Sequence, residues 1–106
     1  MKWYSFATEM EFEFDPAKSL TNRSKHGMDF VAAQDMWLVP GAQKRLPFVG
    51  EDRYLRIAIL GGKYWSVVFT LRGVKARIIS VRRARPDEEA DYERAAARDT
   101  LDHPKP

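Results

Sequence analysis

The feature that most constrains the fold is a change of hydrophobic period at Arg53. Over residues 53–83, apolar side chains recur at every second position, which is the period of a β-strand. Short glycine-containing connections at Gly61-Gly62 and at Gly73 divide this stretch into three segments. Because such connections join antiparallel neighbours, the stretch predicts an antiparallel meander.

The register of the first hairpin follows from where the apolar residues would lie. A two-residue glycine turn would set Ala58 beside Trp65 and mix apolar and polar side chains on each face. A three-residue loop over residues 60–62 sets Ile57 beside Trp65 instead and keeps one face apolar. We therefore predict the three-residue loop. The opposite face would then present Tyr54, Arg56, Tyr64, Ser66, Thr70 and Arg72.

Capping residues mark two helices before the meander. Asp15 is a favoured N-cap, and Pro16 suits the first helical position, where its missing N–H has no partner to lose. Gly27 suits the left-handed position that ends a helix. Asp29 predicts the start of a second, shorter helix, which Pro40 ends.

The remaining segments complete the predicted architecture. The alternation over residues 11–14 predicts a short strand, and Pro86 begins a last helix with acidic residues in its first turn. Residues 41–52 suit either a weak edge strand or a loop. The sequence thus predicts an α+β fold: an N-terminal strand, two helices, an antiparallel meander of three to four strands and a C-terminal helix.

Length and composition limit the classes of protein that remain. The 106 residues suit one domain over 1–106, with residues 1–10 expected to be a frayed extension and 99–106 a frayed tail. The chain has no cysteine, which excludes disulfides and thiol catalysis. No secretory signal or membrane span is visible, so we expect a cytoplasmic protein.

The basic residues are concentrated in the predicted sheet. Residues 53–85 carry nine Lys and Arg and no Asp or Glu, whereas residues 86–106 carry seven acidic residues against three basic ones. A block of one sign interleaved with aromatic residues indicates a polyanionic partner, and nucleic acid is the first candidate. A solvated basic sheet face is the alternative interpretation.

One face of the first predicted helix carries polar groups that could act in chemistry. Lys18, Asn22, Lys25 and His26 fall within an arc of roughly 100° on an ideal helix. His26 is the side chain among them whose ordinary pKa lies near neutrality, so it could act as a general acid or base. The alternative is a solvated face with basic residues at the negative end of the helix dipole.

Known motifs for cofactors and metals are absent. The sequence contains no phosphate-binding glycine loop, no nucleophilic serine elbow and no metal-ligand spacing among its histidines and acids. We therefore expect no cofactor and no metal.

Several blocks of sequence, in this order and spacing, resemble the BrnT toxin family from about Phe12 to Tyr92. They are Phe12-x-Phe-Asp15-Pro-Ala-Lys18, Asn22-x-x-Lys25-His26-Gly27-Met-x-Phe30-x-x-Ala33, Arg53-x-x-x-Ile57-x-x-x-Gly61, Val67-Val-Phe-Thr-x-Arg72-Gly73, Arg77-Ile-Ile-Ser80-x-Arg82-Arg83-Ala84 and Glu88-x-x-x-Tyr92. The resemblance implies a fold similar to that of RelE-type ribonucleases and a toxin that arrests bacterial growth by cleaving RNA. It also implies neutralisation by a ribbon-helix-helix (BrnA-like) antitoxin, which brings the complex to operator DNA.

The implied reaction is metal-independent RNA cleavage, in which a ribose 2′-OH attacks the adjacent phosphate. It needs a base, an acid and fixed cations for the phosphorane charge, a role that the planar guanidinium of arginine suits. The candidate catalytic residues are Lys25 and His26 for proton transfer, with Arg72, Arg82 and Arg83 as phosphate clamps. The candidate RNA-binding residues are Lys18, Arg53, Arg56, Tyr64 and Arg77. The alternative function is a non-catalytic basic module that binds a partner protein or nucleic acid.

The tandem Arg82-Arg83 raises a geometric question. Neighbouring side chains of a strand point to opposite faces, so one site cannot hold both unless a bulge or the strand end intervenes. If Arg72 pairs with Lys75, regular pairing puts Arg83 on the face of Tyr64. A three-residue loop there would instead put Arg82 on that face. The pattern of apolar residues leaves both registers open.

Overall fold

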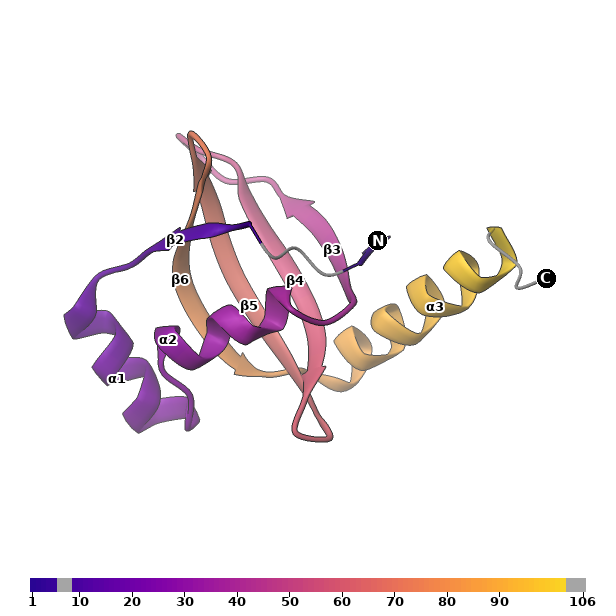
Figure 1. The fold of residues 1–106 in the computed structure, drawn as a ribbon, viewed down its shortest axis with the longest axis horizontal. Coiled ribbons are helices and arrows are strands. Elements are labelled where there is room, and N and C mark those ends of the chain that lie inside the picture. The colour runs from indigo at the N-terminus through magenta and orange to yellow at the C-terminus, as the bar shows by residue number, and fades with distance from the viewer. Residues whose placement is uncertain (6–8, 103–106) are drawn as a thin grey trace.

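A computed structural model describes residues 1–5 and 9–102, and this part of the chain forms a six-stranded sheet with helices on both faces (Figure 1). The strand order is β1-β3-β4-β5-β6-β2, antiparallel except where β2 pairs with β6. The elements are β1 (Lys2–Tyr4), β2 (Glu11–Glu13), α1 (Pro16–His26), α2 (Phe30–Ala33), the 3-10 helix η1 (Gln34–Trp37), β3 (Gly41–Leu46), β4 (Arg53–Leu60), β5 (Lys63–Arg72), β6 (Lys75–Arg83) and α3 (Pro86–Asp102). The predicted α+β class and the meander are confirmed.

The predicted capping residues begin and end the helices. Asp15 Oδ1 accepts from the backbone N–H groups of Ala17 at 2.9 Å and Lys18 at 3.4 Å, and Gly27 ends α1 with a φ of 82°. Asp29 Oδ1 accepts from the N–H of Ala32 at 2.8 Å at the start of α2. Short-range hydrogen bonds of this kind depend on local sequence alone, which is why the helix starts were predictable.

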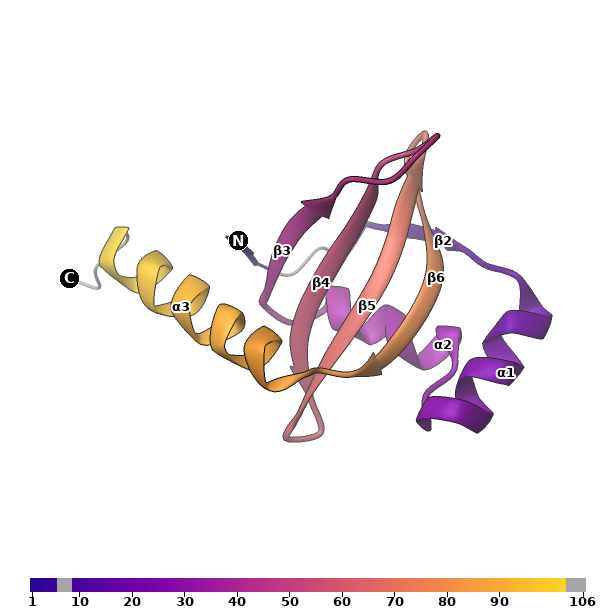
Figure 2. The same cartoon turned by 180° about the vertical axis from the view of Figure 1, so that it is seen from behind.

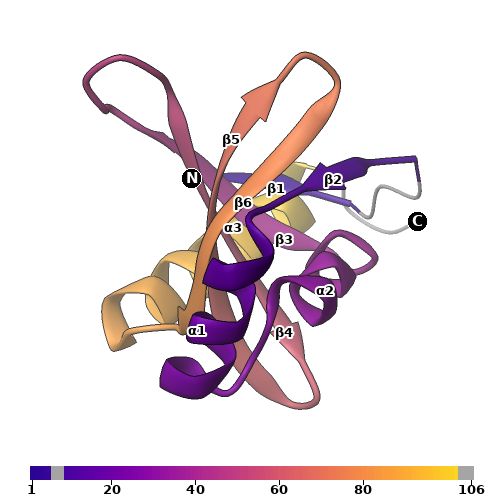
Figure 3. The same cartoon turned by 90° about the vertical axis from the view of Figure 1, so that its left-hand side faces the viewer.

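The predicted register of the first hairpin is wrong. Gly61 and Gly62 form a two-residue turn between the paired Leu60 and Lys63, so Ala58 lies beside Trp65 and Arg56 beside Val67. Tyr54 and Arg56 consequently share a face with Trp65, Val67 and Phe69. The prediction assumed that one sheet face is polar, whereas in the structure helices cover both faces (Figure 3).

The core between the sheet and the N-terminal helices is aromatic and aliphatic. Trp37 of η1 meets the ring of Phe69 edge-on, with centroids 5.0 Å apart. The buried members of this cluster are Phe30, Ala33, Met36, Trp37, Ala58, Trp65, Val67, Phe69, Ala76, Ile78 and Val81. Their burial holds α2 and η1 against β4, β5 and β6.

Helix α3 packs on the other face of the sheet, as Figure 2 shows from behind. Tyr92 of α3 meets the rings of Trp3, at 5.0 Å between centroids, and of Tyr64, at 5.4 Å. Leu55 and Ile57 of β4 are buried on the α3 face of the sheet, because they alternate along the strand with residues that face the N-terminal helices. No helix among the described residues has the length and apolar character needed to span a membrane.

Both ends of the chain differ from the expected frayed segments. Residues 2–4 form β1, in which Trp3 pairs with Ala42 of β3, so β3 is an internal strand and not the edge strand or loop considered for 41–52. Helix α3 continues to Asp102, beyond the expected end near Asp99. The last four residues of the predicted tail, like residues 6–8, lie outside the described part of the chain.

Candidate functional site

A surface hollow of about 270 Å³ lies between α1 and β6 and is lined by residues of both. Its rim carries the exposed side chains of Lys18, Lys25 and His26. The last two lie in the final turn of α1, where the negative end of the helix dipole favours cations. The structure therefore brings three of the predicted site residues to one surface.

Asn22, expected on the same solvent-facing surface, is instead a buried structural residue. Its Nδ2 donates to the carbonyl oxygens of Val81 and Met28, both at 2.7 Å, and its Oδ1 accepts from the N–H of Val81 at 3.2 Å. β2 pairs only with residues 75–77 of β6, and beyond it the Asn22 side chain satisfies the backbone N–H and carbonyl of Val81 at the same edge of β6. These bonds fix the distance between the basic rim of α1 and the end of β6.

A β-bulge decides the orientation of the tandem arginines. Arg72 pairs with Lys75, as in the first register considered, but the pairing shifts at Val68/Phe69 and leaves Ile79 as the extra residue. As a result, residues 80–83 of β6 point to the sheet face opposite to the one that regular pairing would give them. Arg82 therefore lies opposite Ser66, and Arg83 opposite Trp65.

Arg82 is held by a carboxylate at the start of α3. Its Nη1 and Nη2 donate to Oε1 and Oε2 of Glu88 at 2.6 and 2.8 Å. Glu88 Oε1 also accepts from Ser66 Oγ at 3.0 Å and from the N–H of Arg85 at 2.9 Å. Glu88 is 6% exposed, so its carboxylate is largely shielded from water, whereas the Arg82 side chain is partly exposed.

The electrostatics of the pair favour its ionised form. Burial by itself would raise the pKa of Glu88, but the hydrogen bonds from Arg82, the Arg85 N–H and Ser66 outweigh it and lower that pKa to about 2. The hydrogen bond to Glu88 in turn raises the pKa of Arg82. A phosphate that approached Arg82 would therefore compete with a two-pronged carboxylate already in place.

Arg83 is exposed on the other face, the one that α1 and α2 cover. Its Cζ lies 5.6 Å from the centroid of the Trp65 ring. Within residues 1–5 and 9–102, no carboxylate forms an ion pair with Arg83, Lys25 or His26. The end of β6 and the last turn of α1 lie at the same end of the molecule (Figures 1 and 3).

Arg72 lies far from these groups. It is exposed at the opposite end of β5, six residues beyond Ser66, the partner of Arg82. Six residues of extended strand span about 20 Å. The structure therefore does not bring Arg72 together with the other candidate catalytic residues.

Arg56, expected to contact RNA, is 2% exposed. Its Nε donates to the carbonyl oxygen of Met36 at 3.0 Å and its Nη2 to that of Val39 at 2.9 Å. Burial lowers the pKa of Arg56 to about 10. The guanidinium thus holds the η1–β3 connection against β4. Because it is buried, Arg56 is not proposed to contact RNA.

The other candidate RNA-binding residues are at least partly accessible, and three of them, Arg53, Arg77 and Tyr64, contact other side chains. The guanidinium of Arg53 lies 3.7 Å from the ring centroid of Phe48, and that of Arg77 lies 3.8 Å from Glu13 Oε2. Tyr64 donates to Glu93, and this hydrogen bond raises the pKa of Tyr64 to about 12. Lys18 remains at the rim of the hollow.

Sequence reasoning missed the roles of Glu88, which binds Arg82, and of Ser66, which donates to Glu88. Glu88 follows Arg85 at the spacing of a capping box, in which a carboxylate three positions on accepts from the N-cap N–H. That spacing was a usable signal, but the bond to Arg82 depends on the bulge. Among the described residues, no cluster of three or more His, Asp or Glu side chains could hold a metal ion.

Comparison with models of known protein families identifies a family for this chain. The family model described as the ribonuclease toxin BrnT of type II toxin–antitoxin systems matches residues 14–88. This range contains α1, the meander and all of the candidate site residues. A search of the curated proteins found no match.

Proposed function

Because the chain belongs to the BrnT family of ribonuclease toxins of type II toxin–antitoxin systems, we propose that it is a metal-independent endoribonuclease with a RelE-like fold. The observation that carries the proposal is a set of exposed basic side chains without a carboxylate partner at one end of the molecule. Lys25 and His26 at the end of α1 and Arg83 at the end of β6 form this set, within the described residues.

The proposed reaction is a transfer within the RNA chain. The ribose 2′-oxygen forms a bond to the adjacent phosphorus as a base removes its proton, and the bond from phosphorus to the 5′-oxygen breaks as an acid protonates that oxygen. The products are a 2′,3′-cyclic phosphate and a 5′-hydroxyl. His26 suits one proton transfer because a ring nitrogen of an imidazole can accept a proton and, once protonated, can donate it, and Lys25 is the candidate for the other.

The phosphorane charge needs a cation that is free to meet it. We assign this role to Arg83, because the carboxylate of Glu88 already occupies Arg82. Arg82 then positions the end of β6 and the start of α3. Arg72, Lys18, Arg53 and Arg77 are proposed to contact phosphates of the RNA away from the scissile bond.

Membership of a type II family implies an antitoxin partner and an RNA target. We further propose that the antitoxin is a ribbon-helix-helix, BrnA-like protein, that operator DNA is bound through the complex, and that the toxin acts in the cytoplasm. Expression of the chain alone in a bacterial host tests the proposal: growth should stop while total RNA is degraded. Co-expression of a ribbon-helix-helix protein from the neighbouring reading frame should restore growth. Unimpaired growth with abundant folded protein would favour a non-catalytic binding module.

A further inference from the structure

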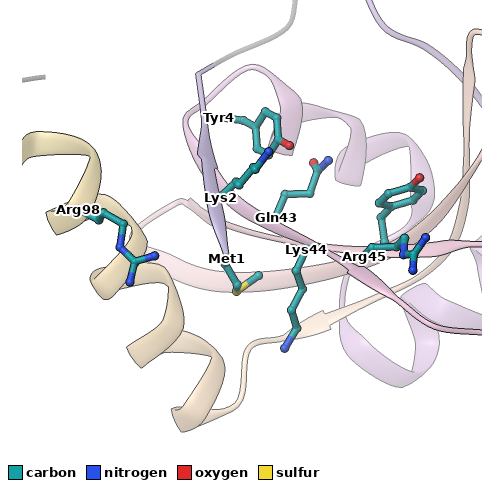
Figure 4. A pocket seen from close by; sticks show the side chains of 8 residues that line it. Met1, Lys2, Tyr4, Gln43, Lys44, Arg45 and Arg98 are labelled. Carbon is teal, nitrogen blue, oxygen red and sulfur yellow. The ribbon is translucent and has the colours of Figure 1, made fainter. Parts of the chain in front are cut away.

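A second basic cavity lies at the opposite edge of the sheet, between β1, β3 and α3 (Figure 4). Its volume is about 420 Å³. The charged side chains that line it are Lys2, Lys44, Arg45 and Arg98, and its lining includes no carboxylate. Figure 4 shows Arg98 reaching from α3 toward β1, while Lys2, Tyr4 and Gln43 lie close together.

The acidic groups near the cavity only partly offset this charge. Asp52 Oδ2 lies 3.5 Å from Arg45 Nη1, but both side chains are more than half exposed, so this pair contributes little. Asp99 lines the adjoining hollow, together with Lys2 and Arg98. Four cations against two carboxylates leave a net positive site, which favours an anionic ligand.

The neutral groups of the cavity suit a nucleotide. Gln43 Oε1 accepts from Arg56 Nη1 at 3.4 Å, so the amide of Gln43 keeps its N–H donors for a ligand. Tyr4 is 42% exposed, which leaves its ring accessible for stacking. Exposed rings beside a cationic groove are the combination that binds single-stranded nucleic acid, since bases stack on the rings while phosphates meet the cations.

We propose that this cavity is a second contact for single-stranded RNA, separate from the cleavage site. The proposal rests on the proposed function for the identity of the nucleic acid. Four strand spacings separate β1 from β6, which is about 19 Å across the sheet. Met1, Lys2, Tyr4 and Arg98 lie outside residues 14–88, so half of the residues that line the cavity belong to parts of the chain beyond the family match.

The test is equilibrium binding of a 2′-O-methyl RNA of about ten nucleotides, a length within the usual range for one small domain. This probe lacks the attacking hydroxyl, so binding is measured without cleavage. The double variant Lys2→Ala/Arg98→Ala should bind roughly tenfold more weakly, and the slope of log K against log salt should fall by about 1.4, the value for two lost phosphate contacts on a single strand. Both side chains are exposed, so the melting temperature should not change.

Arg94→Ala is the matched control, because Arg94 lies one turn earlier on α3, pairs with Asp91 and does not line the cavity. It should bind the probe as the wild type does. Unchanged affinity and salt slope in the folded double variant would overturn the proposal, as would an equal loss in Arg94→Ala. If the wild type cleaves no RNA but binds the probe through Lys2 and Arg98, the proposed function fails and the RNA contact stands. Loss of antitoxin binding with unchanged RNA binding would instead assign the cavity to the protein partner and overturn the proposal.

Discussion

Arg82 and Glu88 form a two-pronged ion pair that joins the end of β6 to the first turn of α3, with N–O distances of 2.6 and 2.8 Å. Arg83, which follows Arg82 in the chain, points to the opposite face of the sheet and has no carboxylate partner among the described residues. Two adjacent arginines thus have different surroundings.

Arg82→Ala and Arg83→Ala should have unlike effects. The first leaves the buried carboxylate of Glu88 without its cation and should lower the free energy of unfolding by about 2–4 kcal/mol. The second should leave the melting temperature nearly unchanged but abolish toxicity, because loss of a charged phosphate clamp costs about 2–4 kcal/mol of transition-state stabilisation. Melting curves and RNA cleavage by the purified variants measure both effects. Equal, mild losses of activity with unchanged melting temperatures would place the site elsewhere.

The same pair predicts how stability depends on pH. The pKa of Glu88 is about 2 in the folded protein against an ordinary value of 4.5, so the folded state binds this proton more weakly than the unfolded state does. The stability from this group is therefore present above pH 4.5 and is lost as the pH falls toward 2. The loss should reach up to about 3 kcal/mol in urea unfolding. Glu88→Gln should lack this part of the pH dependence, and an identical profile in that variant would contradict the assignment.

Cleavage should need no divalent metal ion. The proposed chemistry uses side chains alone, and the described residues offer no metal cluster. Purified protein should therefore cleave RNA in excess EDTA and leave a 2′,3′-cyclic phosphate on the upstream fragment. End-group analysis of the fragments checks the product. Activity that disappears in EDTA and returns with a divalent ion would refute the mechanism.

Arg56→Met should destabilise the protein without weakening RNA binding by the folded fraction. The substitution removes the donors to the carbonyl oxygens of Met36 and Val39 and should lower the free energy of unfolding by about 2–4 kcal/mol. Gly41→Ala is a companion variant that keeps the charge, since its Cβ would lie 2.8 Å from the Ile57 carbonyl oxygen and 3.0 Å from Arg56 Cζ. It should also be destabilised. A stable Arg56→Met variant with weaker RNA binding would restore the role in RNA contact.

Features that depend on near neighbours in the chain were predictable from the sequence. The N-caps Asp15 and Asp29, the ending of α1 at Gly27 and the period of two from Arg53 each depend on contacts within a few residues. The basic block over residues 53–85 and the basic end of α1 belong to the same class of observation. These charge patterns indicated a candidate site on α1 and β6, but they did not predict how its side chains are oriented.

Orientation was decided by tertiary structure, because strand alternation converts a shift of one residue into a change of face. The predicted hairpin register assumed one apolar and one polar sheet face, but helices cover both faces. Arg56 is therefore a core residue and not a surface residue. The bulge at Ile79 then moved Arg82 toward Glu88 and Arg83 toward Trp65. The pairing of β1 with β3 brought Lys2 within reach of Arg98 from the far end of the chain. Each of these outcomes depends on contacts between distant segments, whose energies are set by packing and not by local sequence.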